Sequence, residues 1–186
     1  CECGKTTSLI SGCSEFISSK NLINELSDYL SQKPVLNYIT FAGSGEPTLN
    51  TALHDTILFL KKTFPEYKTA LLTNGTLFHN KKVRESALNF DLIAPSLDAV
   101  LTSSFKKINH PHHSVSLHSV IEHLISFSHS YTGLLYIEIF IIPGINDSIQ
   151  ELTLFKDILN KIKFTKIHLN SLDRPGTDKS VSVVSR

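Results

Sequence analysis

The stretch Phe41-Ala42-Gly43-Ser44-Gly45-Glu46-Pro47-Thr48-Leu49 links a strand-like run to a helix-like pattern. The run before it, residues 36–41, is short, β-branched and aromatic, which predicts a strand. Apolar residues then recur at helical spacing, at Leu53, Ile57, Leu60 and Phe64. Two glycines, a carboxylate and a proline therefore lie where a strand turns into a helix, which is the edge at which α/β folds bind ligands.

The residue types in this turn indicate what it binds. Gly43 and Gly45 leave no Cβ between a ligand and the backbone, and Pro47 fixes φ and removes a competing donor. We expect a rigid cup of backbone polar groups, completed by Ser44 and Glu46, whose carboxylate favours an ammonium group over a phosphate. The alternative is a plain turn that uses glycine for its geometry, and the pattern lacks the third glycine of a dinucleotide-binding loop.

Composition excludes several classes of protein. The formal net charge of +1 predicts no strong electrostatic field that would argue for or against binding to nucleic acid. No apolar run approaches the roughly 20 residues that span a bilayer. Three cysteines, an odd number, do not make a disulfide framework. We therefore expect a cytoplasmic protein without membrane contact.

Helical and strand patterns alternate along the chain. Helical patterns cover 22–30, 53–64, 81–88, 117–127 and 149–162. Strand patterns cover 36–43, 67–73, 91–98, 134–142 and 164–169. Nearly continuous apolar strands between amphipathic helices predict an α/β fold with a parallel sheet buried on both faces, formed as one domain over residues 1–186.

Polar motifs follow each expected strand. They are Gly43–Pro47, Thr73–Gly75, Ser96–Asp98, Pro143–Asp147 and Asn170–Pro175. Because the carboxyl ends of parallel strands share one edge of a sheet, we expect all five motifs to lie at one rim and to build a site there. Asn74-Gly75 also fits a simple turn, and Asn146-Asp147 fits an amino-terminal cap for the following helix.

Together with Cys1-Glu2-Cys3-Gly4-Lys5-Thr6-Thr7, these motifs resemble the radical S-adenosylmethionine (radical SAM) enzymes, and most of all the iron–sulfur oxidoreductases related to wyosine synthesis. The resemblance spans nearly the whole chain in order. It implies a partial (β/α)6 TIM-like barrel that holds a [4Fe-4S] cluster and S-adenosyl-L-methionine, and that cleaves SAM reductively to start hydrogen abstraction. It also suggests a flavodoxin or ferredoxin as electron donor and an RNA or modified nucleotide as substrate.

The cysteines depart from the pattern that the resemblance implies. These enzymes ligate their cluster with a C-x3-C-x2-C loop, whereas this chain has Cys1, Cys3 and Cys13. We expect Cys1 to be the third ligand, with the other two ligands and the first strand of the barrel preceding it. Cys3 is expected to be a free thiol and Cys13 a bystander.

The resemblance also implies which residues meet SAM. Glu46 would accept a hydrogen bond from the SAM ammonium, by itself or by holding the loop, although capping the next helix is an alternative role. Ser96 and Asp98 are two residues apart and are expected on one face, with Asp98 a candidate for the ribose diol and turn chemistry the alternative. The full expected SAM set is Gly43, Ser44, Gly45, Glu46, Pro47, Asn74, Ser96, Asp98 and Asn170.

The segment 100–113 is expected to be a long, weakly packed loop over the rim, where Lys106, Lys107 and His110 would face a polar substrate. Two functions outside radical chemistry stay open. One is a barrel that keeps the SAM cup for binding or scaffolding without a cluster. The other is a metal-free enzyme that uses Glu46 and Asp98 as an acid–base pair.

Overall fold

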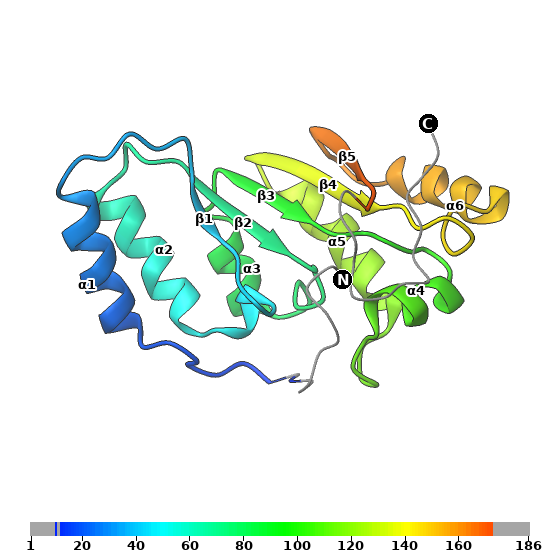
Figure 1. The fold of residues 1–186 in the computed structure, drawn as a ribbon, viewed down its shortest axis with the longest axis horizontal. Coiled ribbons are helices and arrows are strands. Elements are labelled where there is room, and N and C mark those ends of the chain that lie inside the picture. The colour runs from blue at the N-terminus through cyan, green and yellow to red at the C-terminus, as the bar shows by residue number, and fades with distance from the viewer. Residues whose placement is uncertain (1–9, 11, 173–186) are drawn as a thin grey trace.

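Residues 10 and 12–172 are described by the computed structural model, in which five parallel strands form one sheet in chain order (Figure 1). The strands are β1 (Ile39–Phe41), β2 (Thr69–Thr73), β3 (Leu92–Pro95), β4 (Leu134–Phe140) and β5 (Lys166–Asn170). The helices are α1 (Ser19–Leu30), the 3-10 helix η1 (Pro47–Leu49), α2 (Ala52–Thr63), α3 (Lys81–Ala87), α4 (Thr102–Asn109), α5 (Leu117–Ser130) and α6 (Ile149–Leu159).

This order confirms the expected α/β alternation and the parallel sheet of a partial barrel. Each strand pairs in parallel with the next one along the chain. All five strands are shorter than expected, and three of them stop early at the carboxyl end: β1 ends at Phe41, β3 at Pro95 and β4 at Phe140. The residues that follow these strands are therefore free to build loops at the carboxyl edge.

The sheet has one packed face and one face that the described helices leave open, so the expected burial on both faces is met only on the packed face. On the packed face, Leu71, Ile93 and Ile137 are fully buried against helical residues such as Ile57 and Phe127. Because side chains alternate along a strand, their neighbours point to the other face. That open face has a much smaller apolar cluster. The side chains on it are those of Tyr38, Ala70, Leu72, Leu92, Ala94, Ser96, Tyr136, Glu138, Lys166 and His168.

The expected loop at 100–113 is wrong in its main feature, because α4 occupies most of it. Phe105 is buried and packs with Ala99 and Leu117, which anchors the helix to the rest of the fold. His110 ends the helix in the left-handed conformation, with φ of 42°. The segment is therefore a packed helix followed by a short turn, and not a weakly packed lid.

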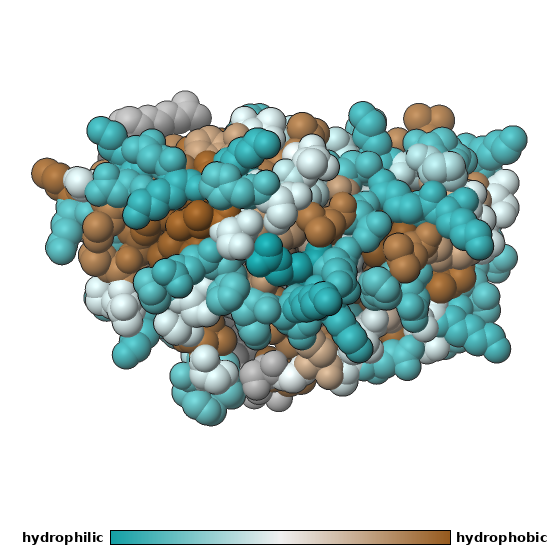
Figure 2. Space-filling model, turned by 180° about the vertical axis from the view of Figure 1, so that it is seen from behind, coloured by the Kyte–Doolittle hydropathy of each residue, from teal (hydrophilic) through white to brown (hydrophobic). Residues whose placement is uncertain are grey.

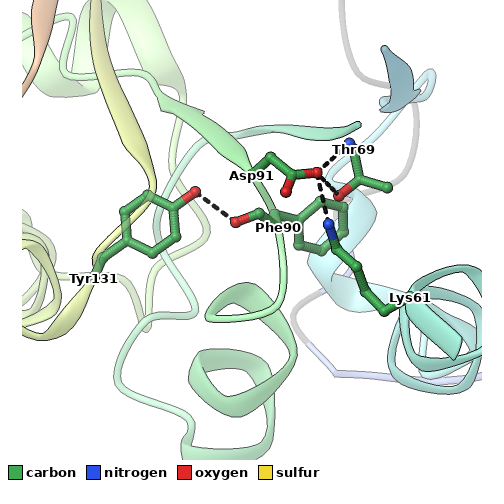
Figure 3. A network of polar contacts seen from close by, with 5 residues as sticks. All are labelled: Lys61, Thr69, Phe90, Asp91 and Tyr131. Carbon is green, nitrogen blue, oxygen red and sulfur yellow. Dashed lines mark hydrogen bonds and ion pairs between the residues drawn. The ribbon is translucent and has the colours of Figure 1, made fainter. Parts of the chain in front are cut away.

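A polar network holds the amino-terminal edge of the sheet (Figure 3). Asp91 Oδ2 accepts hydrogen bonds from Lys61 Nζ at 2.6 Å, from Thr69 N at 2.6 Å and from Thr69 Oγ1 at 3.0 Å. Burial acts to raise the pKa of Asp91, but the hydrogen bonds and charge of Lys61 and the bonds from Thr69 lower it overall. Nearby, Tyr131 donates to Phe90 O at 2.8 Å, and burial raises the pKa of this tyrosine.

The reverse side of the molecule is covered mainly by hydrophilic side chains, with apolar groups scattered between them (Figure 2). Within residues 10 and 12–172, the structure has no helix of the length and apolarity that crossing a membrane requires.

Candidate functional site at the carboxyl edge of the sheet

The loops after β1, β2, β3 and β4 lie at the carboxyl edge of the sheet, whereas residues 173–175 of the motif Asn170–Pro175 lie outside the described residues. Glu46 lies between β1 and α2, and its Oε1 accepts hydrogen bonds from Thr48 N at 3.1 Å and from Thr73 Oγ1 at 2.6 Å. Its Oε2 accepts from Asn74 N at 2.7 Å. One carboxylate therefore ties the loop after β1 to the end of β2. The helix that Glu46 caps is η1, whereas α2 begins after Thr51 without a side-chain cap.

The two glycines of this loop have no internal reason to be glycine. A Cβ built at Gly45 meets no atom within 4 Å, and one built at Gly43 comes no closer than 3.7 Å, to Gly45 O. Neither residue has a positive φ, whereas Gly75 and Gly144 do. Both glycines and Ser44 between them are exposed. The loop thus leaves an open space beside its backbone, which is the shape expected of a ligand cup.

Asn74 is at the rim, but its side chain shapes its own turn. Its Oδ1 accepts hydrogen bonds from Thr76 N at 3.0 Å and from Thr76 Oγ1 at 2.7 Å. Gly75 follows with φ of 69°, a conformation that glycine adopts readily. This geometry fits the alternative turn role, and the exposed backbone of Asn74 stays next to the Glu46 carboxylate.

Asp98 joins the loop after β3 to the end of β4. Its Oδ1 accepts from Phe140 N at 2.9 Å, and its Oδ2 accepts from Asn109 Nδ2 at 3.0 Å. Burial raises the pKa of Asp98, and these two hydrogen bonds only partly oppose the rise. Two residues earlier, Ser96 pairs with Glu138 of β4, so the structure places Ser96 at the rim between these strands.

Asn170 ends β5, opposite Phe140 of β4, and is exposed. Its backbone oxygen accepts a hydrogen bond from Ile141 N at 2.8 Å, which extends the pairing of the two strands to the rim.

Sequence reasoning missed the role of Asn146, a fully buried residue. Its Nδ2 donates to Asp98 O and to Phe140 O, both at 2.7 Å, and its Oδ1 accepts from Ile142 N at 2.7 Å. The expectation that Asn146-Asp147 caps the next helix is wrong, because Ser148 caps α6. A polar residue after an apolar strand was the only signal, and it fits a cap equally well.

Glu151 was also missed, and it explains why α4 forms. This carboxylate is fully buried in the first turn of α6. It accepts hydrogen bonds from Val100 N at 3.0 Å, from Leu101 N at 3.1 Å and from Ser104 Oγ. It therefore satisfies backbone donors at the start of α4 and adds a favourable charge there.

The described residues do not form a cluster site. Cys1, the expected ligand, lies outside them, as does Cys3. Cys13 is exposed, with its Sγ 3.9 Å from Thr48 O. Across residues 10 and 12–172, no three His, Cys, Asp or Glu side chains are arranged to hold a metal ion. His112 and His113 instead place their ring centroids 4.0 Å apart.

Comparison with known proteins finds relatives that are longer than this chain. No protein-family model matches the sequence. A UPF0026 protein of Helicobacter pylori strain J99 is 35% identical over 128 residues, which cover 69% of this chain and 41% of that protein. Other UPF0026 proteins match as well, and so does a protein named GTPase Obg of Brachyspira hyodysenteriae, which is 31% identical over 69% of this chain and 19% of that protein. None of these relatives is named as a member of the expected wyosine-synthesis subgroup.

Two solved structures share the fold. A domain of pyruvate-formate lyase-activating enzyme from Bacteroides vulgatus has a TM-score of 0.58 and 20% identity, covering 79% of this chain and 84% of that one. A radical SAM methyltransferase from Sphaerobacter thermophilus has a TM-score of 0.58 and 16% identity, covering 82% and 45%. The fold is therefore the partial barrel found in radical SAM enzymes.

Proposed function

We propose that this chain is the core of a radical SAM enzyme that binds SAM at the carboxyl edge of its sheet. The observation that carries the proposal is the loop Gly43–Pro47. Its glycines border open space that the fold does not need, and its glutamate is fixed by the next loop. A preorganised loop of this kind binds a ligand without first having to order itself.

The cup would bind the ammonium group of SAM through its backbone. Glu46 already accepts hydrogen bonds from Thr48, Thr73 and Asn74, so its main role is to hold the exposed carbonyl groups of Gly43 and Gly45 in place. Its negative charge lies beside the cup and adds to the attraction for a cation. Ser44 and Pro47 complete the loop.

The remaining rim residues would orient the rest of the ligand. Asp98 has both oxygens engaged, but a carboxylate has about four lone-pair sites, so it is still able to accept from a ribose hydroxyl. Ser96 and Asn170 lie at the carboxyl ends of their strands, and Asn74 would contribute its exposed backbone, because its side chain is bonded to Thr76. The packed helices on the other face exclude water from one side of the site.

A bound [4Fe-4S] cluster would supply the electron for reductive cleavage of SAM and so start hydrogen abstraction. The described residues do not fit this group, so we propose that Cys1 ligates it together with two cysteines encoded before Cys1 in the complete gene. The oxidoreductase activity, the flavodoxin or ferredoxin donor, the cytoplasmic setting and an RNA or modified-nucleotide substrate belong to the same proposal. It treats residues 1–186 as one domain.

A second candidate is a barrel that binds SAM without a cluster. It is favoured by the lack of a metal-binding group within the described residues. The two candidates differ in the gene. Cysteines three and seven positions before Cys1 support the enzyme, and their absence supports the cluster-free barrel.

The proposal is tested on the complete gene product, reconstituted without oxygen. We expect four iron and four sulfide per chain, and conversion of SAM to 5′-deoxyadenosine after reduction. Cys1→Ala should lose both the cluster and the cleavage of SAM. Cys13→Ala is the matched control and should keep the cluster and the cleavage, because Cys13 is an exposed free thiol. A protein that is loaded with cluster but inert towards SAM would contradict the enzyme assignment.

A further inference from the structure

A row of polar side chains crosses the open face of the sheet just below the rim. Glu138 of β4 lies directly opposite His168 of β5 in the parallel pairing, and Ser96 pairs with Glu138 on the other side. Residues paired across neighbouring strands project from the same face. The three side chains therefore form a continuous row across three strands.

Glu138 and His168 are close enough to attract each other but too far apart for a hydrogen bond. Their Oε1 and Nδ1 atoms are 3.9 Å apart, beyond the usual limit of about 3.2 Å for an N–H···O bond. The side chains are 30% and 33% exposed, so each is mostly covered yet reachable from the open face. A separation of this size in a half-covered site suits a third group that bonds to both side chains.

The electrostatics of the pair favour a hydrogen-bond donor. Burial raises the pKa of Glu138, His168 acts to lower it, and the charge of Asp98 acts to raise it further. Among the described residues, Lys166 of β5 and Tyr136 of β4 also lie on this part of the face. An N–H group bound to Glu138 would replace the water that its carboxylate has lost, and so stabilise the ionised form.

Aromatic rings lie on the same face of the sheet as the Glu138 carboxylate. The ring centroids of Tyr136 and His168 are 5.0 Å apart in an edge-to-face arrangement, and Lys166 Nζ is 5.8 Å from the centroid of Tyr136. Aromatic faces next to a carboxylate suit a nitrogen group that is flat or cationic, since both kinds pack on a π surface.

We propose that Glu138 and His168 form a substrate-binding pair on the open face, which takes a nitrogen group with hydrogen-bond donors. Glu138 accepts the N–H and His168 contacts the same group. The group is a flat nitrogen heterocycle or a guanidinium-type cation, and both share the donor chemistry. This inference rests on the proposed function, because it takes the open face to be the substrate side of the rim.

The test uses the complete gene product saturated with SAM and two probes, guanidinium and cytosine. Dissociation constants are measured by ligand-observed NMR for the parent protein, Glu138→Gln and His168→Gln. The matched control is the double variant His118→Gln and Glu122→Gln, which removes a similar His–Glu pair at 3.3 Å from the exposed surface of α5. Thermal melting confirms that each variant folds.

We expect at least one probe to bind the parent and the control equally, and to bind Glu138→Gln and His168→Gln at least tenfold more weakly. Binding should strengthen as pH rises and Glu138 ionises, and this dependence should vanish in Glu138→Gln. If guanidinium binds more tightly than cytosine, the site is assigned to a cation. If cytosine binds more tightly, the site is assigned to a heterocycle. Binding of neither probe, or unchanged affinity in Glu138→Gln, would overturn the inference. SAM binding measured in parallel separates this failure from failure of the proposed function.

Discussion

The two edges of the sheet use the same kind of side chain in opposite ways. At the amino-terminal edge, the Asp91 carboxylate is bound by Lys61 and Thr69, and its pKa is lowered. Just below the carboxyl-terminal rim, burial raises the pKa of Glu138, whose partner His168 is too distant for a hydrogen bond. The first carboxylate has three hydrogen-bond donors within the chain, all on Oδ2, and the second keeps capacity for another group.

This difference in the pairing of the two carboxylates distinguishes the edge of the sheet that stabilises the fold from the edge that serves function. A paired carboxylate adds stability when it ionises, whereas a partly desolvated one reduces stability unless a ligand supplies the missing bonds. Folds of this type place their chemistry at the carboxyl ends of strands and their structural contacts at the other end. The pKa directions of Asp91 and Glu138 follow that division.

The largest expected effect concerns the Asn146 clamp, by which we mean the uncharged Asn146 side chain and its three hydrogen bonds at the carboxyl edge of the sheet. Asn146→Ala removes three hydrogen bonds and leaves Ile142 N, Asp98 O and Phe140 O without their buried partner. We expect the free energy of unfolding to fall by about 3 kcal/mol in chemical denaturation. Asn89→Ala is the control, because it removes a single hydrogen bond, to Glu85 O, at the surface. Equal stability of the two variants would show that the clamp is not what holds this edge.

The next effect concerns the amino-terminal edge. Asp91→Asn should reduce the free energy of unfolding at pH 7 by about 1 kcal/mol, a value discounted for solvent screening because the Asp91 side chain is 38% exposed. The folded pKa is below the ordinary 3.8, so the contribution of Asp91 is full above that pH and is lost as pH falls through the folded pKa.

Denaturation of the parent, of Asp91→Asn and of the exposed control Asp28→Asn across this pH range checks the expectation. A deficit of Asp91→Asn that persisted unchanged in strong acid would rule out ionisation as its cause.

The smallest effect should have the opposite sign. Glu138→Gln should leave stability unchanged in acid and raise it by less than about 1 kcal/mol at neutral pH. The folded pKa of Glu138 is above the ordinary 4.5, so the parent loses stability as pH rises from that value through the folded pKa, and the variant does not. The same denaturation series measures it. A Glu138→Gln protein less stable than the parent at neutral pH would break the contrast between the two edges.

Local patterns were enough to predict most of the fold. Apolar periodicity predicted five strands and five helices because each of these elements buries its own apolar residues. Helix α4 was missed because its start, Thr102-Ser103-Ser104, has weak helix propensity. Its stability comes from Glu151, about 50 residues later, and from burial of Phe105. Contacts between elements distant in sequence leave no periodic signal.

The position of the site at the carboxyl edge of the sheet was predictable from the sequence, but the contacts between its residues were not. The glycines and Glu46 were found because an acidic Gly-x-Gly turn after a strand is an unusual local pattern. The partners of Glu46 could not be found, since Thr73 ends the next strand and Asn74 follows it. Asn146 was interpreted as a cap, because its buried bonds to Asp98 and Phe140 exist only in the folded chain.

The central claim is that the loop at Gly45 is a SAM cup and not a structural turn. A Cβ at Gly45 meets no atom of the fold within 4 Å, so we expect Gly45→Val to fold normally and to fill the space proposed for the ligand. Gly12→Val is the matched control, because a Cβ at Gly12 also meets nothing within 4 Å. Calorimetric titration of the complete gene product with SAM should show binding at least tenfold weaker in Gly45→Val, with Gly12→Val unchanged. SAM affinity in Gly45→Val equal to that of the parent would contradict the account.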